Sequence, residues 1–160
     1  MPGVVILVDV DGVVNPLSSA RPGAISRSMR MDARMGPRLK ALSRLAELVW
    51  VSGWDAATRA TIAATFGLPT FRAVETAGAP VGTSTPNGPA VADWLAQHAP
   101  PGAWRGVVWI DDVLEGDAVA WAEEQRFPVH LIRPHPVQGL QDAHVDDAAR
   151  FVAGLTIESG

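Results

Sequence analysis

Four short apolar runs, rich in β-branched residues, alternate along the chain with segments whose apolar residues recur at helical spacing. Such runs are typical of strands buried on both faces of a parallel sheet. The expected strands are 4–8, 48–51, 107–110 and 129–132. The expected helices run from Pro37 up to the second strand, then over 56–66, 89–98, 118–124 and 142–154. Because parallel strands joined by helices need right-handed crossovers, the pattern predicts a three-layer α/β/α fold around a doubly wound, mostly parallel sheet.

The segment at about 15–37 departs from this pattern, since three prolines lie in it and no apolar period is sustained. We expect a loop and short hairpin, or flap, inserted into a single domain that spans 1–160. The stretches between the first three predicted strands are too short for a separate cap domain, which predicts an open site. Arginines of the flap, Arg27 and Arg30 among them, are then the candidates for substrate contact.

Composition narrows the possible chemistry. A chain of 160 residues with 48% apolar content can build one hydrophobic core. It has no cysteine, which excludes disulfides, thiolate zinc sites and a cysteine nucleophile. A net charge of −4 without a long basic tract gives no expectation of a nucleic-acid partner. Two aspartates interrupt the N-terminal apolar run, so we expect a cytoplasmic protein without a membrane anchor.

Polar residues gather where the predicted strands end. The first strand leads into Asp9 and Asp11, the second into Ser52, and the third into Asp111 and Asp112. Ligands of parallel α/β sheets bind beyond the carboxyl ends of the strands. Carboxylate oxygens suit Mg²⁺, so we expect a Mg²⁺ site formed by the first aspartate pair and by one member of the second.

Three segments resemble motifs of the haloacid dehalogenase-like (HAD) hydrolase superfamily in the right order. Residues 5–15 resemble its first motif, 49–54 its second, and 108–112 together with Asp117 its fourth. In its expected lack of a cap domain the chain resembles the capless members of the superfamily. The resemblance implies a HAD-like Rossmannoid fold and a hydrolase that depends on Mg²⁺.

The resemblance also implies a role for each matching residue. Asp9 is expected to be the nucleophile and a metal ligand, and Asp11 the general acid and base that also lends its backbone carbonyl to the metal. Ser52, with the backbone of Gly53, is expected to bind phosphate. Asp112 is the expected third metal ligand, and Asp111 lies behind it or replaces it.

Other polar positions have simpler explanations. Asp117 is expected to cap the following helix or to brace the fourth-motif loop. Trp54 is expected to form a wall of the pocket or to cover the edge of the core.

One family feature is missing. The superfamily carries a lysine or arginine near the start of the helix before the third predicted strand, yet residues 82–89 contain no basic residue. Asn87 offers a hydrogen bond there but no charge, and Lys40 lies in an earlier helix. Arg27 and Arg30 of the flap are the candidates to replace the missing cation.

The sequence therefore supports two main hypotheses. The first is a Mg²⁺-dependent phosphohydrolase, a phosphatase that acts on a phosphorylated substrate through an aspartyl-phosphate. The alternative is a catalytically impaired HAD-like domain that binds phosphate or a phosphorylated partner. A receiver-like signalling domain is a weaker third reading, because its phosphorylated aspartate is expected after the third strand.

Overall fold

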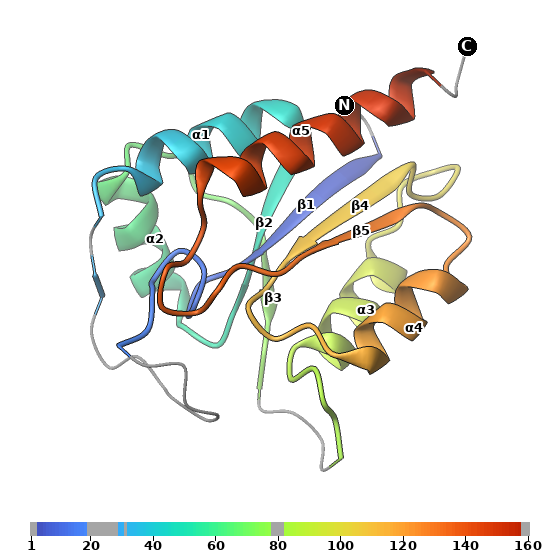
Figure 1. Ribbon diagram of the computed structural model, residues 1–160, viewed down its shortest axis with the longest axis horizontal. Coiled ribbons are helices and arrows are strands. Elements are labelled where there is room, and N and C mark those ends of the chain that lie inside the picture. Colours follow the sequence, from blue (N-terminus) through green and yellow to red (C-terminus); the bar gives the residue numbers. More distant parts are fainter. Residues whose placement is uncertain (1–2, 19–28, 31, 78–81, 158–160) are drawn as a thin grey trace.

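The fold is built on a sheet of parallel strands. The computed structural model describes residues 3–18, 29–30, 32–77 and 82–157. Within these residues the five-stranded sheet has the order β3-β2-β1-β4-β5, and every neighbouring pair is parallel. The strands are β1 Val4–Asp9, β2 Glu47–Ser52, β3 Ala73–Glu75, β4 Gly106–Ile110 and β5 Val129–Ile132 (Figure 1).

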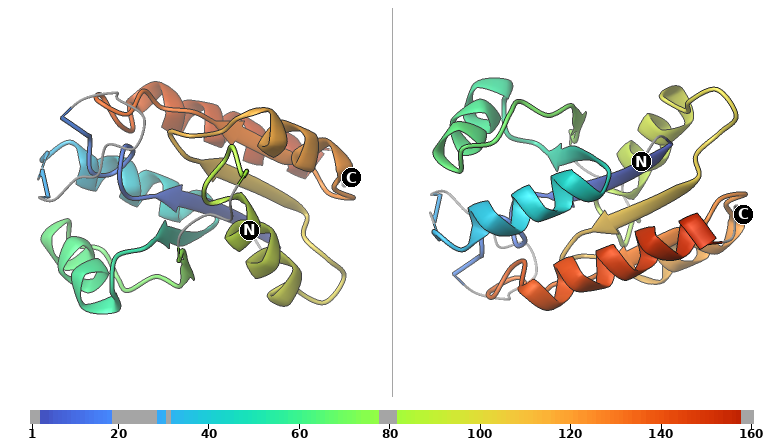
Figure 2. Two further views of the ribbon diagram at one scale, coloured as in Figure 1. Left: turned by 90° about the horizontal axis from the view of Figure 1, so that it is seen from below. Right: turned by 90° about the horizontal axis from the view of Figure 1, so that it is seen from above.

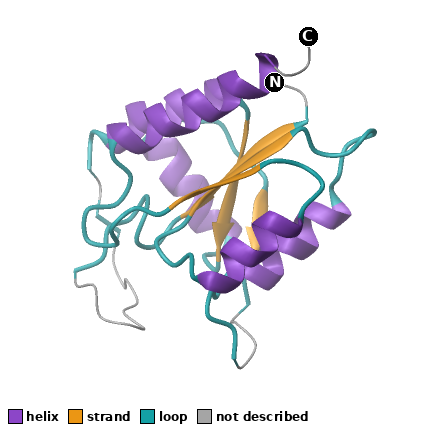
Figure 3. Ribbon diagram, turned by 45° about the vertical axis from the view of Figure 1, so that its right-hand side comes forward, coloured by secondary structure: helices purple, strands orange, loops and turns teal. Residues whose placement is uncertain are grey.

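Helices cover both faces of this sheet (Figure 3). They are α1 Met35–Leu45, α2 Ala56–Thr65, α3 Gly88–Gln97, α4 Gly116–Glu124 and α5 Asp142–Ile157. One hydrophobic core joins the sheet to α1, α2 and α5, and a second joins it to α3 and α4. Figure 2 shows α1 and α5 running alongside each other on the first face. The predicted three-layer α/β/α fold is confirmed.

The central strand β1 explains why the sheet is sandwiched. Its even-numbered apolar residues belong to the core under α1 and α5, and its odd-numbered ones to the core under α3 and α4. Side chains of a strand point alternately to its two faces, so an uninterrupted apolar run requires cover on both. The strand ends at Asp9, which places a carboxylate at the carboxyl end of a fully buried strand.

The structure differs from the sequence prediction mainly at element ends. The short edge strand β3 has a single buried residue, Val74, and no apolar run identified it. Helix α1 begins at Met35, before Pro37, because a proline within the first turn gives up no helical hydrogen bond. Helix α4 begins at Gly116, two residues earlier than predicted. Residues 19–28 and 31 of the predicted flap lie outside the described residues.

A loop of residues 134–141, which we call the support loop, packs against the turn that follows β1. Leu140 N–H donates to the Val13 carbonyl at 2.9 Å, and Leu17 N–H donates to the Pro136 carbonyl at 2.8 Å. Gly139 has φ +68°, and a Cβ there would lie 2.5 Å from the Val13 carbonyl oxygen. Only glycine therefore fits, and the turn after β1 is held from one side by close backbone contacts.

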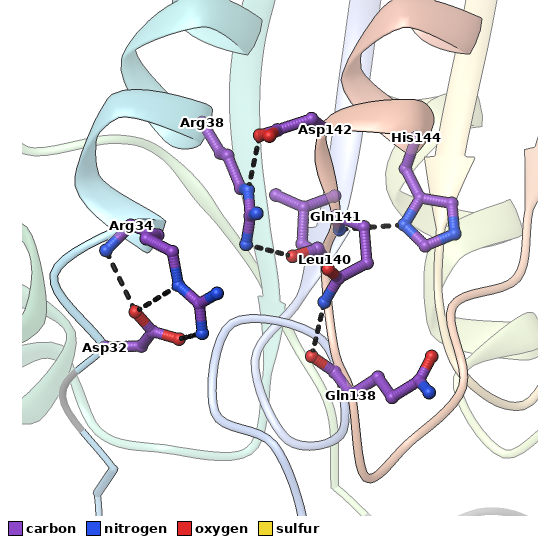
Figure 4. Close-up of polar contacts among 8 residues, drawn as sticks. All are labelled: Asp32, Arg34, Arg38, Gln138, Leu140, Gln141, Asp142 and His144. Atoms are coloured by element: carbon purple, nitrogen blue, oxygen red, sulfur yellow. Dashed lines mark hydrogen bonds and ion pairs between the residues drawn. The ribbon is translucent and has the colours of Figure 1, made fainter.

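Arg38 of α1 fixes the support loop in turn (Figure 4). Its buried guanidinium donates to Asp142 Oδ1 at 2.7 Å and to the Leu140 carbonyl at 2.9 Å. The charged group is thus satisfied inside the fold, as burial requires. Arg34, one turn earlier, makes an exposed pair with Asp32. No described helix has the length and apolar character needed to cross a membrane.

Candidate functional site

Three aspartates from two strand ends meet at the carboxyl rim of the sheet. Val8 of β1 pairs with Ile110 of β4, so the residues that follow, Asp9 and Asp111, lie next to each other. Carboxylate oxygens of Asp9, Asp111 and Asp112 all lie within 4.8 Å of one another. The three residues are 8%, 1% and 9% exposed, respectively. We call these three residues the aspartate cluster.

Burial and mutual repulsion perturb all three carboxyl groups. Burial, followed by the charges of Asp111 and Asp112, raises the pKa of Asp9 well above its usual value. Burial also raises the pKa of Asp111 to about 7, although hydrogen bonds from Val113 and Asn87 oppose the shift. The pKa of Asp112 is raised by burial as well. No ion pair among the described residues involves the cluster.

The cluster fits a hard divalent cation. Its donors are carboxylate oxygens close enough to share one ion, and Mg²⁺ prefers one or two such groups together with water and phosphate oxygens. A cation at this place would offset the repulsion that raises the pKa values. The residues present are therefore suited to the metal that the HAD-like motifs imply.

Gly12 leaves the space that the cluster needs. Its φ is +84°, and a Cβ there would lie 2.4 Å from both Cγ and Oδ2 of Asp112. Its N–H donates to the Asn15 carbonyl at 2.8 Å, which closes the turn after β1. Asp112 approaches this turn closely only because residue 12 has no side chain.

Asp11 lies beside the cluster but faces other partners. Its carboxylate accepts hydrogen bonds from Trp54 Nε1 at 2.8 Å and from Asn15 Nδ2 at 3.2 Å. Asn15 Oδ1 in turn accepts the backbone N–H of Arg30 at 2.8 Å, and the Arg30 side chain is exposed. The sequence did not reveal the contact of Trp54 with Asp11, although both residues lie within matched motifs. Arg27 lies outside the described residues.

The predicted phosphate-binding residues lie at the same rim. Asp9 pairs with Val51, so Ser52 is one position beyond it on β2. Ser52 is buried, and its hydroxyl accepts the backbone N–H of Trp54 at 2.9 Å. Gly53 follows in an exposed turn. Phosphate binding by these residues stays a prediction.

Asn87 contacts the aspartate cluster from the segment in which the sequence comparison looked for a lysine or arginine. It immediately precedes α3, and its Nδ2 lies 2.8 Å from Asp111 Oδ2 and 3.5 Å from Asp9 Oδ1. Lys40 lies on α1, where its ammonium is next to Gly67 beyond α2. Among the residues that the structure describes, an amide rather than a charged group therefore contacts the cluster from α3.

Asp117 braces the loop that carries Asn87. Its carboxylate accepts the N–H groups of Ser84 and Thr85 at 3.1 and 2.9 Å and the Thr85 hydroxyl at 2.5 Å. The N-cap of α4 is Glu115, so the expected cap role of Asp117 is wrong, and the loop that Asp117 braces is the one at 84–85 and not the expected fourth-motif loop. Hydrogen bonds to the charged form lower the pKa of Asp117.

The chain was compared with protein families, curated proteins and solved structures, and the family match agrees with the motifs. No curated protein is significantly similar to this chain in sequence. Among solved structures, the cobalt-bound deoxy-D-mannose-octulosonate 8-phosphate phosphatase of Haemophilus influenzae matches with 16% identity and a TM-score of 0.42, over 96% of this chain and 88% of that one. Residues 5–145 match the family described as "HAD domain in Swiss Army Knife RNA repair proteins". With β2, β4 and the aspartate cluster all inside that match, the chain belongs to this family of HAD domains.

Proposed function

We propose that this protein is a Mg²⁺-dependent phosphohydrolase that works through an aspartyl-phosphate on Asp9. The observation that carries the proposal is the convergence of three buried carboxylates, with Asp11 beside them, at the rim of the sheet. Membership of a HAD family supports it. Three buried carboxylates without a partner cation are costly for a fold, and that cost is explained if a metal ion is their function.

Each residue has a defined task in this reaction. Asp9, Asp111 and Asp112 would hold Mg²⁺, which when bound neutralises charge on the phosphoryl oxygens and aligns the phosphorus. An oxygen of Asp9 attacks phosphorus, the ester P–O bond breaks, and Asp11 gives its proton to the departing alkoxide. Asp11 then takes a proton from water, which attacks the phosphorus of the aspartyl-phosphate. Phosphate leaves and the Asp9 carboxylate is restored.

The substrate is a phosphomonoester, and a large one is favoured. Among the described residues no separate domain covers the rim, so the site is open to a bulky ligand. The family is described from RNA repair proteins, which favours a terminal phosphate of RNA. The net charge of −4, in contrast, argues against a nucleic-acid substrate. A comparison of RNA phosphates with other phosphate esters decides between these two expectations.

Turnover measurements test the proposal. Purified protein is assayed with p-nitrophenyl phosphate, with an alkyl phosphate, and with RNA oligonucleotides carrying a 3′- or 5′-phosphate, each in Mg²⁺ and in EDTA. We expect phosphate release that needs Mg²⁺ and is abolished by Asp9→Asn. Asp93→Asn, on the exposed side of α3, is the matched control and should leave the rate unchanged. Turnover that survives Asp9→Asn would contradict the proposal.

The second candidate is a phosphate-binding domain with little catalytic activity. The specific observation in its favour is that Asn87, and not a lysine or arginine, contacts Asp9 and Asp111. A missing cation at the site of developing charge costs on the order of 10²-fold in rate. Asn87→Lys is expected to raise the rate under this alternative, whereas Asn87→Ala is not. If both variants are slower than wild type, the native amide is sufficient and the first candidate stands.

A further inference from the structure

We infer that Trp54 is a positioning residue that holds the Asp11 carboxyl group in place for protonation of the leaving group. The inference rests on the proposed function, because Asp11 has this task only in a phosphohydrolase. It goes further by assigning a role to a side chain that, among the described residues, makes its hydrogen bond to Asp11 and not to the aspartate cluster.

Asp11 is held by two donors, one from its own motif and one from the second motif. The indole Nε1–H of Trp54 donates to Oδ2 at 2.8 Å, and the side-chain amide of Asn15 donates to Oδ1 at 3.2 Å. Each carboxyl oxygen thus has one fixed donor, and rotation of the group would break both hydrogen bonds. A carboxyl oxygen has two lone-pair directions, so one remains on each oxygen for the proton that is transferred.

Trp54 is itself anchored through its backbone. Its N–H donates to the Ser52 hydroxyl at 2.9 Å, and its carbonyl accepts a hydrogen bond from Arg59 Nη1. Arg59 is buried and is paired with Glu75 Oε1 of β3 at 2.6 Å. The indole is therefore presented to Asp11 by a rigid chain of contacts from α2 and β3. These contacts support a positioning role for Trp54, because packing of the indole ring alone would not require its N–H to face a carboxylate.

The predicted effect depends on the leaving group. In the first chemical step the Asp9–phosphorus bond forms, the ester P–O bond breaks, and the alkoxide takes its proton from Asp11. An alkoxide is strongly basic and needs this proton, whereas p-nitrophenolate is stable enough to leave without it. A misplaced Asp11 should therefore slow alkyl esters selectively.

Trp54→Phe tests this distinction, since it keeps an aromatic side chain at this position and removes the indole N–H donor. Because kcat/KM covers the steps up to formation of the aspartyl-phosphate, it is measured for an alkyl phosphate and for p-nitrophenyl phosphate. We expect a loss of about 10- to 100-fold with the alkyl ester, the size of one hydrogen bond to a charged group. The p-nitrophenyl ester should change by less than about threefold. Trp121→Phe, on α4, is the matched control and should change neither value.

Equal losses with both esters would overturn the inference, because they would mean that Trp54 only maintains the fold. No loss with either ester would also overturn it. Failure of the proposed function would look different, because the wild type itself would then show no turnover. In that case the catalytic part of the inference would fall as well.

The contact itself can be tested without turnover. The six tryptophans each give an indole N–H resonance in a ¹⁵N-correlated spectrum. The resonance that disappears in Trp54→Phe should exchange slowly with water in the wild type and at least about tenfold faster in Asp11→Ala. An exchange rate that Asp11→Ala does not change would show that Trp54 does not hold Asp11, even in a catalytically active protein.

Discussion

Replacing Asp9 by asparagine is expected to stabilise the metal-free protein at pH 8 while it removes the proposed nucleophile. The substitution preserves shape, and the asparagine oxygen can still accept the Val10 N–H that Asp9 Oδ1 accepts at 2.9 Å. The new amide N–H groups face the remaining carboxylates of the cluster instead of a third negative charge. The variant therefore loses repulsion without losing packing.

The magnitude follows from the spacing of the cluster. Two carboxylates no more than 4.8 Å apart repel each other by about 3 kcal/mol at an effective dielectric constant near 20. Relaxation of the free side chains takes up part of this energy, so we expect a gain of about 1–3 kcal/mol in the free energy of unfolding. For a chain of this size each kcal/mol raises Tm by about 2–4 °C.

The pH dependence has a definite sign. Carboxyl groups whose pKa is raised by folding contribute stability that is present below about pH 4 and is lost as the pH rises through the folded pKa. For Asp111, with a folded pKa of about 7, the loss falls between about pH 4 and pH 7 and amounts to roughly 4 kcal/mol. The advantage of Asp9→Asn should thus be small at pH 5 and largest at pH 8. His144, whose pKa is lowered by burial, acts in the opposite direction but equally in both proteins.

Thermal unfolding of both proteins at pH 5 and pH 8, in EDTA and in excess Mg²⁺, measures these effects. In EDTA at pH 8 the variant should have the higher Tm. Mg²⁺ should raise the Tm of the wild type more than that of the variant. An ion stabilises the folded state that it binds, and the wild type offers it one more carboxylate. A variant that is less stable than wild type in EDTA at pH 8 would refute the account of the cluster as a set of repelling charges.

Three further substitutions test the framework around the site, the third as a control for the second. Gly12→Ala places a Cβ 2.4 Å from Asp112 Cγ at a φ of +84°, so it should lower stability by about 1–3 kcal/mol and weaken Mg²⁺ binding at least about tenfold, as measured by denaturation and calorimetric titration. Arg38→Gln removes the donor to the Leu140 carbonyl and should cost about 1–3 kcal/mol in urea unfolding. Arg34→Gln, which breaks only an exposed pair, should cost less than about 1 kcal/mol, and equal losses for the two arginines would contradict the support-loop interpretation.

Elements with one strong signal were predictable from the sequence. The strand at Val4–Asp9 and the strand at Gly106–Ile110 are uninterrupted apolar runs, and both were expected to within one residue. Since the carboxyl ends of parallel strands share one rim, the meeting of Asp9 with Asp111 and Asp112 followed from topology. Local pattern and strand direction together were sufficient for this part.

Features that depend on contacts between distant segments were not predictable from local patterns. The edge strand β3 is held by pairing with β2 and not by an apolar run of its own. The indole of Trp54 reaches Asp11 because of the turn after Ser52, and no periodicity describes that turn. Asp117 became a brace because α4 begins at Gly116 and thereby brings its carboxylate to Thr85. Each of these contacts joins segments that are distant in sequence.

The central claim is that Asp9 accepts a phosphoryl group in a reaction that needs Mg²⁺. Mass spectrometry of protein quenched in acid during turnover of p-nitrophenyl phosphate tests this most directly. We predict one added phosphoryl group on the peptide that contains Asp9, present with Mg²⁺ and absent in EDTA and in Asp9→Asn. Phosphate release without a phosphorylated peptide, or with the group on another residue, would contradict the account.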